Sequence, residues 1–173
     1  METRMEFVKI QTITFRQHLN IHTLPVNMIE VCKAMGWLVM WSDELEDGLD
    51  SILMHFRGRY AIFLNEEIRN TFQVRWSLSH EAGHIVLAHF MDNELSFHRA
   101  YSTNEGIIWD LNREADIFAA EFLMPSYFIK SNYRLGAHSL AQICGVPIAM
   151  MKSRIEELKF SRPSLKLDAT LIF

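Results

Sequence analysis

The stretch "SLSHEAGHIVLAHF", residues 77–90, decides how the rest of the chain is interpreted. It places three histidines and one glutamate in a segment whose other residues are mostly small or apolar. If the segment is an α-helix, His80 and His84 lie about 40° apart on one face, so both imidazoles can reach a common ion. Glu81 flanks the same point. This His-Glu-x-x-His pattern is typical of a site in which two histidines bind zinc and the glutamate acts as a general base.

A helix with two hydrogen-bonded core histidines and a surface glutamate is the competing interpretation of this stretch. Gly83 favours the metal site, because glycine within a helix costs about 1 kcal/mol relative to alanine and indicates close approach of a neighbouring segment. His89 is about 140° from His84 around the helix, so we expect it to face elsewhere. The extended pattern with a third histidine requires histidine at position 90, which here is Phe90.

A catalytic zinc needs a third protein ligand, and a second predicted helix over residues 110–124 offers four acidic candidates. Counting residues around its apolar face places Glu114 about 85° from the centre of that face, and the other three lie further round. Glu114 is therefore best placed to lean over the first helix. For each acid, a solvated helix charge is the alternative. The other candidates are Asp110, Asp116 and Glu121.

Length and composition are those of an ordinary globular chain of 173 residues, 49% hydrophobic and 22% charged. The net charge of −4 gives no overall attraction to nucleic acid or to an anionic membrane. The two cysteines, Cys32 and Cys144, are expected to be buried reduced thiols. No secretion signal or bilayer-length apolar run is visible, so we expect a soluble, cytoplasmic protein without membrane partners.

Periodicity along the rest of the chain predicts an α+β fold. Two alternating runs around Arg57-Gly58-Arg59 indicate a β-hairpin with a three-residue loop. A buried strand is expected at 37–41, and a strand or packed segment at the carboxyl end. Helices are expected over residues 25–36, 71–91 and 110–124 and on both sides of Gly145-Val146-Pro147.

HEAGH followed about 30 residues later by READIFAAEFLMP resembles the ImmA/IrrE family of metallopeptidases. The family pattern after the histidine motif is E-A-x-x-F-A-x-x-(L/F)-L-M-P. The residues that match it here are Glu114, Ala115, Phe118, Ala119, Leu123, Met124 and Pro125. The resemblance extends over about residues 24–160.

This resemblance implies a zincin-like core over residues 1–125, in which a small sheet with a hairpin packs on the HExxH helix and a second ligand helix. A helical, helix-turn-helix-like segment, 126–173, follows. The metal ligands would be His80, His84 and Glu114, with Glu81 as the catalytic base. One Zn²⁺ per chain is implied, with Mn²⁺ as an alternative. The implied substrate is a protein, namely a helix-turn-helix repressor of a phage, mobile element or stress regulon.

Two other functions compete with the peptidase. Residues 139–158 have a helix-turn-helix pattern, and the overlapping stretch 152–166 carries basic residues that include Arg154 and Lys159, which suggests a DNA-binding regulator. The acidic net charge and the apolar second helix argue against direct nucleic-acid binding. A metal-dependent interaction protein without turnover is the third possibility. The candidates for a second oxyanion donor are His98, Tyr101, Arg113 and Tyr127.

Overall fold

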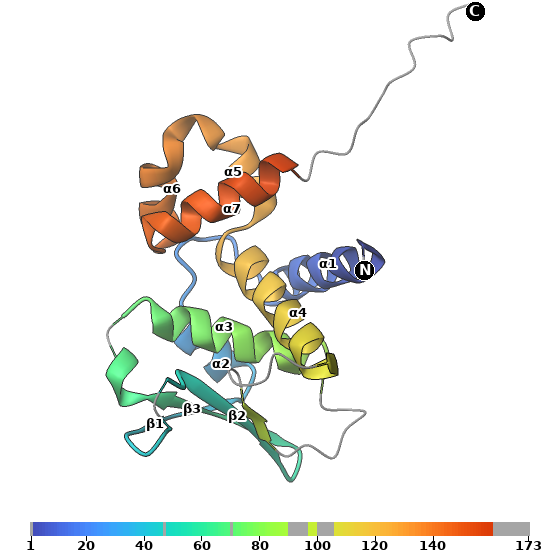
Figure 1. Cartoon of the computed structure of the whole chain (residues 1–173), viewed down its shortest axis with the longest axis vertical. Coiled ribbons are helices and arrows are strands. Elements are labelled where there is room, and N and C mark those ends of the chain that lie inside the picture. The colour runs from blue at the N-terminus through green and yellow to red at the C-terminus, as the bar shows by residue number, and fades with distance from the viewer. Residues whose placement is uncertain (1, 47, 70, 90–96, 100–105, 161–173) are drawn as a thin grey trace, which may run out of the picture.

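The computed structural model describes residues 2–46, 48–69, 71–89, 97–99 and 106–160, and it has the predicted mixed α+β character. A small sheet forms one side of the molecule, and α3 lies over one of its faces (Figure 1). Helices α4 and α1 pack beyond α3, and α5, α6 and α7 lie at the end furthest from the sheet. The elements in chain order are α1 (Glu2–His18), α2 (Met28–Ala34), β1 (Leu38–Ser42), β2 (Ser51–Phe56), β3 (Arg59–Asn65), the 3-10 turn η1 (Glu66–Ile68), α3 (Gln73–Val86), β4 (Phe97–Arg99), α4 (Gly106–Leu123), α5 (Ser126–Ser131), η2 (Tyr133–Leu135), α6 (Gly136–Cys144) and α7 (Ile148–Phe160).

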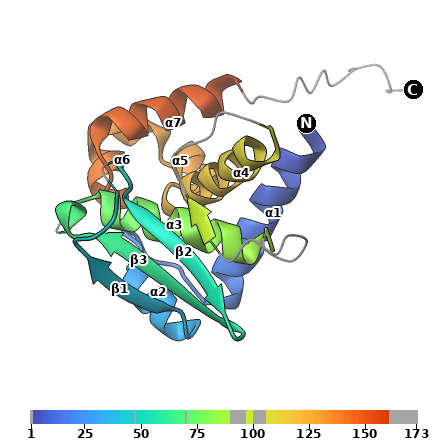
Figure 2. The ribbon, with the colours of Figure 1, turned by 60° about the horizontal axis from the view of Figure 1, so that its bottom comes forward.

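The sheet has the strand order β1-β3-β2-β4, in which only the β1–β3 pair is parallel (Figure 2). The predicted hairpin is confirmed as β2–β3, but its loop is shorter than expected. Phe56 pairs directly with Arg59, so the turn consists of Arg57 and Gly58, with φ of 49° and 75°. Two positive φ angles characterise the turn whose twist matches that of the flanking strands.

The prediction of a buried strand at 37–41 is wrong, because β1 is an edge strand. The side chains of Leu38 and Met40 are 51% and 38% exposed. On the opposite side of the sheet, Leu53, Ile62 and Leu64 of the central strands are fully buried. The helices cover only this inner face, so an apolar strand sequence does not guarantee burial on both faces.

Close packing of α3 against α4 positions the candidate site. A Cβ atom added to Gly83 would lie 3.1 Å from Ala115 Cα and 3.1 Å from Phe118 Cβ. Ala82 and Ala119 are fully buried. Glycine therefore allows the two helix backbones to approach one another, and the expected close approach at Gly83 is confirmed.

Helix α1 was not anticipated from the sequence, yet it completes the core beside α4. Phe15 lies between Trp37, at 6.1 Å between ring centroids, and Phe122, at 5.7 Å. Both cysteines are free and buried, as expected, and burial raises the pKa of Cys32 to about 12 and that of Cys144 to about 11. Within the described parts of the chain, no helix is both long and apolar enough to span a bilayer.

Two sequence expectations fall on the less fully described segments. His98, one of the candidate oxyanion donors, lies in β4, where it is paired with Leu53 of β2. The carboxyl-terminal segment 161–173 lies outside the described residues. The two short helices predicted around Gly145 are confirmed as α6 and α7, and Gly145 ends α6 with a φ of 63°.

Candidate metal centre

His80 and His84 converge from successive turns of α3. Both are buried, with 2% and 0% exposure. Their Nε2 atoms are 3.1 Å apart, and the two rings meet edge to face with centroids 4.8 Å apart. Two nitrogens bound to one tetrahedral zinc are about 3.3–3.4 Å apart, since each Zn–N bond is about 2.0–2.1 Å long. The two imidazoles are therefore spaced almost as two ligands of one ion would be.

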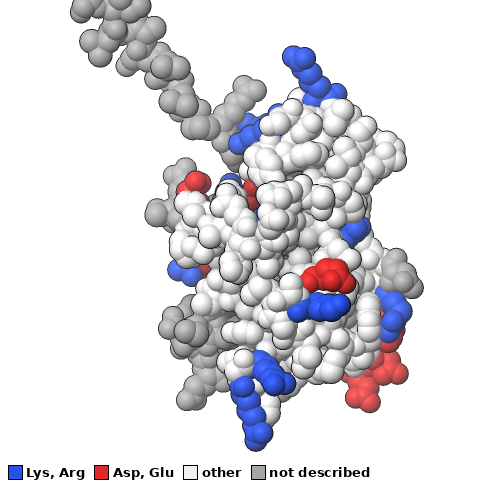
Figure 3. Space-filling model, turned by 180° about the vertical axis from the view of Figure 1, so that it is seen from behind, with Lys and Arg blue, Asp and Glu red and all other residues white. Residues whose placement is uncertain are grey.

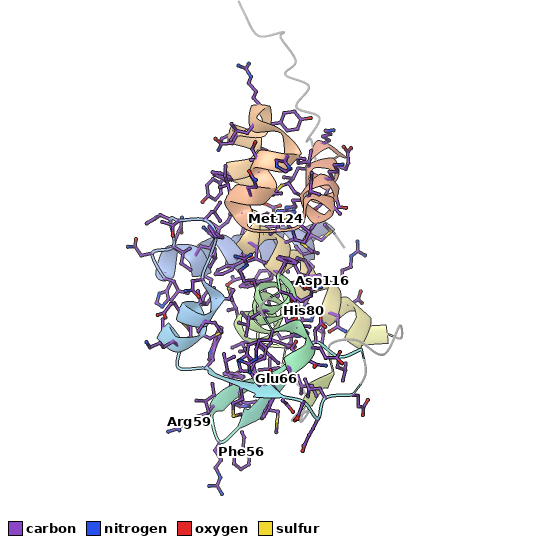
Figure 4. The ribbon with its side chains drawn as sticks, turned by 90° about the vertical axis from the view of Figure 1, so that its left-hand side faces the viewer. Phe56, Arg59, Glu66, His80, Asp116 and Met124 are labelled. Atoms are coloured by element: carbon purple, nitrogen blue, oxygen red, sulfur yellow. The ribbon has the colours of Figure 1, made fainter. Side chains whose placement is uncertain are left out.

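The opposite nitrogen of each ring is engaged by a residue outside α3. His80 Nδ1 is 2.9 Å from Oδ1 of Asp116 on α4, a pair whose members are both labelled in Figure 4. His84 Nδ1 is 2.9 Å from Nδ1 of His89. If each Nδ1 carries the proton of its ring, both Nε2 atoms present lone pairs to one another, and a proton or a cation must lie between them. Metal-binding histidines commonly have this outward hydrogen bond.

His89 does not face away, so that expectation is wrong. Helix α3 ends at Val86, and Ala88 has a φ of 57°, which turns the chain back towards the helix. His89 is only 5% exposed, and its Nε2 is 3.2 Å from Glu114 Oε2. The predicted 140° separation assumed an unbroken helix through residue 89. The helix ends before that residue, and the angle does not apply.

Glu114 lies on the facing helix α4, and the imidazole of His89 contacts both it and His84. It is 8% exposed, and Arg4 Nε donates a hydrogen bond to its Oε1 while His89 contacts its Oε2. Within the described parts of the chain, no three His, Cys, Asp or Glu side chains form a ready metal site. Arg4 at present holds Oε1, so Glu114 would have to release that hydrogen bond to present Oε1 as a ligand, and its ligand role stays a prediction.

Glu81 is completely buried beside the two histidines, so it is not the surface glutamate of the competing interpretation. Ser51 Oγ on β2 donates to Glu81 Oε1 at 2.6 Å, while Oε2 has no hydrogen-bond partner among the described residues. Burial raises the pKa of Glu81, although the charge of His80 and the hydrogen bond from Ser51 oppose the shift. Sequence reasoning missed Ser51, because a serine at the start of a strand carries no metal-site signal.

The surroundings of His80 favour positive charge. Burial alone would lower the pKa of His80, but the hydrogen bond that His80 donates to Asp116 and the negative charges of Glu81 and Asp116 outweigh it, and the net shift is upward. The same two carboxylates would stabilise a divalent cation at this point. His80, His84 and Glu81 therefore fit a cation chemically, with Glu114 close by.

A cavity of about 490 Å³ between α1 and α4 adjoins Glu114. It is lined by Arg4, Met5, Asp110, Leu111, Arg113, Glu114 and Ile117. Of the residues considered as a second hydrogen-bond donor to the oxyanion, Arg113 lines this cavity, whereas Tyr127 is on α5 and is 55% exposed. Tyr101 lies outside the described residues.

Comparison with known proteins places the chain in a family. A family model for the M78 peptidases, described as an IrrE N-terminal-like domain, matches residues 32–156. No curated protein matches the sequence. A solved structure described as a Mycobacterium tuberculosis transcriptional regulator has a similar fold, with a TM-score of 0.66 at 15% identity. That match covers 92% of this chain and 48% of the other, so this chain spans about half the length of its structural neighbour. The family model includes α3, α4 and every candidate site residue from Ser51 to Asp116, and the chain belongs to the M78 peptidase family.

Proposed function

We propose that the chain is a metal-dependent endopeptidase that binds one divalent ion, Zn²⁺ with Mn²⁺ as an alternative, through His80, His84 and Glu114. Glu81 is its catalytic base. The observation that carries the proposal is the convergence of the two Nε2 atoms at 3.1 Å beside a fully buried carboxylate. A buried ionisable cluster of this kind costs stability, and it is retained where the chemistry requires it.

A divalent cation at this point would lower the pKa of a water and polarise the scissile carbonyl. Glu81 accepts a proton through Oε2, because Oε1 is already held by Ser51. The same carboxyl then returns the proton to the leaving amine. Its raised pKa suits this exchange, since a base whose pKa is nearer neutrality both accepts and releases a proton readily. Asp116 fixes the ring of His80 through Nδ1.

The proposed substrate is a helix-turn-helix repressor, on the strength of the family resemblance. We further propose that residues 1–125 form a zincin-like core that carries the site. In this proposal residues 126–173 form a helical segment that packs on the core and takes part in binding the substrate.

Glu81→Gln tests the proposed chemistry directly. The amide keeps the shape of the side chain but cannot accept the proton, so we expect metal to be retained and cleavage to fall by about 10²- to 10⁴-fold. The assay incubates the protein with a purified helix-turn-helix repressor, taken from the neighbouring gene where one is encoded there, with and without a chelator, and follows fragments by mass spectrometry. Glu6→Gln, an exposed site on α1, is the matched control. Chelator-resistant cleavage, or cleavage by Glu81→Gln at the wild-type rate, contradicts the proposal.

The structure argues against the DNA-binding alternative, because one of its basic residues is buried in an ion pair. Arg154, one of the basic residues that suggested DNA binding, is 3% exposed and pairs with Glu121. Met151, Ile155 and Leu158 on the same helix are also buried, so α7 uses this face for packing. On the face seen in Figure 3, lysines and arginines are scattered and form no continuous patch. Metal binding without cleavage in the same assay would instead support the interaction protein.

A further inference from the structure

We propose that His89 is a positioning residue that fixes the orientation and tautomer of His84 and connects it to Glu114. The inference rests on the proposed metal site and adds a residue to it. His89 contacts both partners with different atoms, Nδ1 towards His84 at 2.9 Å and Nε2 towards Glu114 at 3.2 Å. It therefore bridges one proposed ligand on α3 and another on α4.

Counting protons along this bridge leaves one arrangement that suits a metal. Two ring nitrogens 2.9 Å apart share a single proton. If His84 is to offer its Nε2 lone pair to a cation, its proton must be on Nδ1, and it then donates to His89 Nδ1. His89 must in turn carry its proton on Nε2, which donates to Glu114 Oε2. One tautomer of His89 satisfies both neighbours.

The geometry assigns His89 to support of the site and not to the metal itself. Its Nδ1 approaches the Nδ1 side of the His84 ring, whereas His80 approaches the Nε2 side. The rings of His84 and His89 meet at 76° with centroids 4.9 Å apart, and the His89 side chain is only 1% exposed. The left-handed conformation of Ala88 directs His89 into this position.

The test compares Zn²⁺ affinity, measured by competition with a chromophoric chelator, and the visible absorption spectrum of the Co²⁺-loaded protein. His89→Phe keeps a ring but removes both nitrogens, and we expect the Kd for Zn²⁺ to rise about 10- to 100-fold, as with other partners of metal-bound histidines. The Co²⁺ spectrum should also change. His89→Gln keeps one amide that can satisfy either neighbour, so it should restore part of the affinity. His138→Phe, at an exposed position on α6, should match the wild type.

The outcomes separate this inference from the proposed function. If wild-type protein binds Zn²⁺ and His84→Ala abolishes binding, but both His89 variants keep the wild-type Kd and Co²⁺ spectrum, the inference is overturned and the function stands. A loss of thermal stability of the metal-free protein with an unchanged Co²⁺ spectrum also overturns it, because His89 would then only support the fold. If the wild type retains no metal, both proposals fail. If His89→Phe does not fold, an intermediate Kd for His89→Gln supports the inference and a wild-type Kd overturns it.

Discussion

At the scale of single residues, the most informative feature is that Glu81 is completely buried, and no lysine or arginine of the described residues is among its partners. A buried carboxylate is costly unless it is paired, or neutralised by a proton. Within the described parts of the chain, the partners of Glu81 are a serine hydroxyl and the neighbouring His80, and burial raises its pKa. A buried carboxyl group of this kind contributes little to the stability of the fold. Its placement beside two convergent imidazoles therefore argues for a catalytic role of Glu81.

Ser51→Ala is expected to shift the acid limb of the pH–activity profile to higher pH. The hydrogen bond from Ser51 stabilises the charged form of Glu81 and so lowers its pKa, in opposition to burial. Without that bond the pKa rises further, and a base that must be deprotonated is then lost at a higher pH as the pH falls. The measurement is kcat/KM for repressor cleavage from pH 5 to 9.

The matched control for Ser51→Ala is Ser153→Ala. Ser153 is exposed on α7 and donates to the backbone carbonyl of Ala149. An acid limb that stays in place in Ser51→Ala, as it should in Ser153→Ala, would show that Glu81 is not the titrating base.

At the scale of elements, the sequence located the two helices that carry the candidate site but not how the chain leaves the first of them. The four-residue spacing of His80 and His84 is a property of the helix interior, and it needed no tertiary information. His89 depends on where the helix ends and on the left-handed Ala88, and non-glycine residues adopt that conformation too rarely to be expected from sequence.

Helix α1 shows a second reason why sequence patterns fail. Its buried side includes Thr12 and Arg16, whereas Phe7 and Ile10 are about half exposed. Apolar residues therefore surround the helix and do not mark a single face, so periodicity gives no clear signal. Arg16 is satisfied by the carbonyl of Phe122, at 2.5 Å, and that partner exists only once α4 is packed beside it.

Gly83→Ala tests whether the close approach of α3 and α4 sets the site. Alanine improves helix propensity by about 1 kcal/mol, but its Cβ would lie 3.1 Å from the backbone of Ala115. Overpacking of this kind costs about 1–3 kcal/mol, so we expect a net loss of stability. Because Asp116 and Glu114 move with α4, Zn²⁺ affinity should fall as well.

Urea denaturation and chelator competition measure these two effects of Gly83→Ala. Gln142→Ala, an exposed position in α6, is the control and should change stability by no more than about 0.5 kcal/mol. A Gly83→Ala protein that is more stable than the wild type and binds metal equally well would show that α3 and α4 can accommodate a Cβ atom at this position.

At the scale of the whole molecule, the carboxyl-terminal helices are joined to the core by buried polar contacts. Arg154 on α7 pairs with Glu121 on α4, and both side chains are almost fully buried, at 2% and 1% exposure. Arg154 also donates to the carbonyl of Met124, while Glu121 accepts from the backbone nitrogen of Ser126 at the start of α5. In the first turn of α3, Arg75 donates a hydrogen bond to the carbonyl of Gly145, which lies between α6 and α7. These contacts make α5–α7 part of one structure with the core.

Arg154→Ala should therefore destabilise the entire described fold and not only its last helices. Removing one member of a buried ion pair leaves the other charge uncompensated, which costs about 3–5 kcal/mol. We expect a single unfolding transition in urea, detected equally by tryptophan fluorescence and circular dichroism, with its midpoint lowered. Lys159→Ala removes one member of an exposed pair with Glu156 on the same helix and should leave the unfolding midpoint close to that of the wild type. Two separate transitions, with the earlier one alone shifted by Arg154→Ala, would instead mean that α5–α7 unfold independently. The buried pair would then hold a separable segment onto a core that is stable by itself.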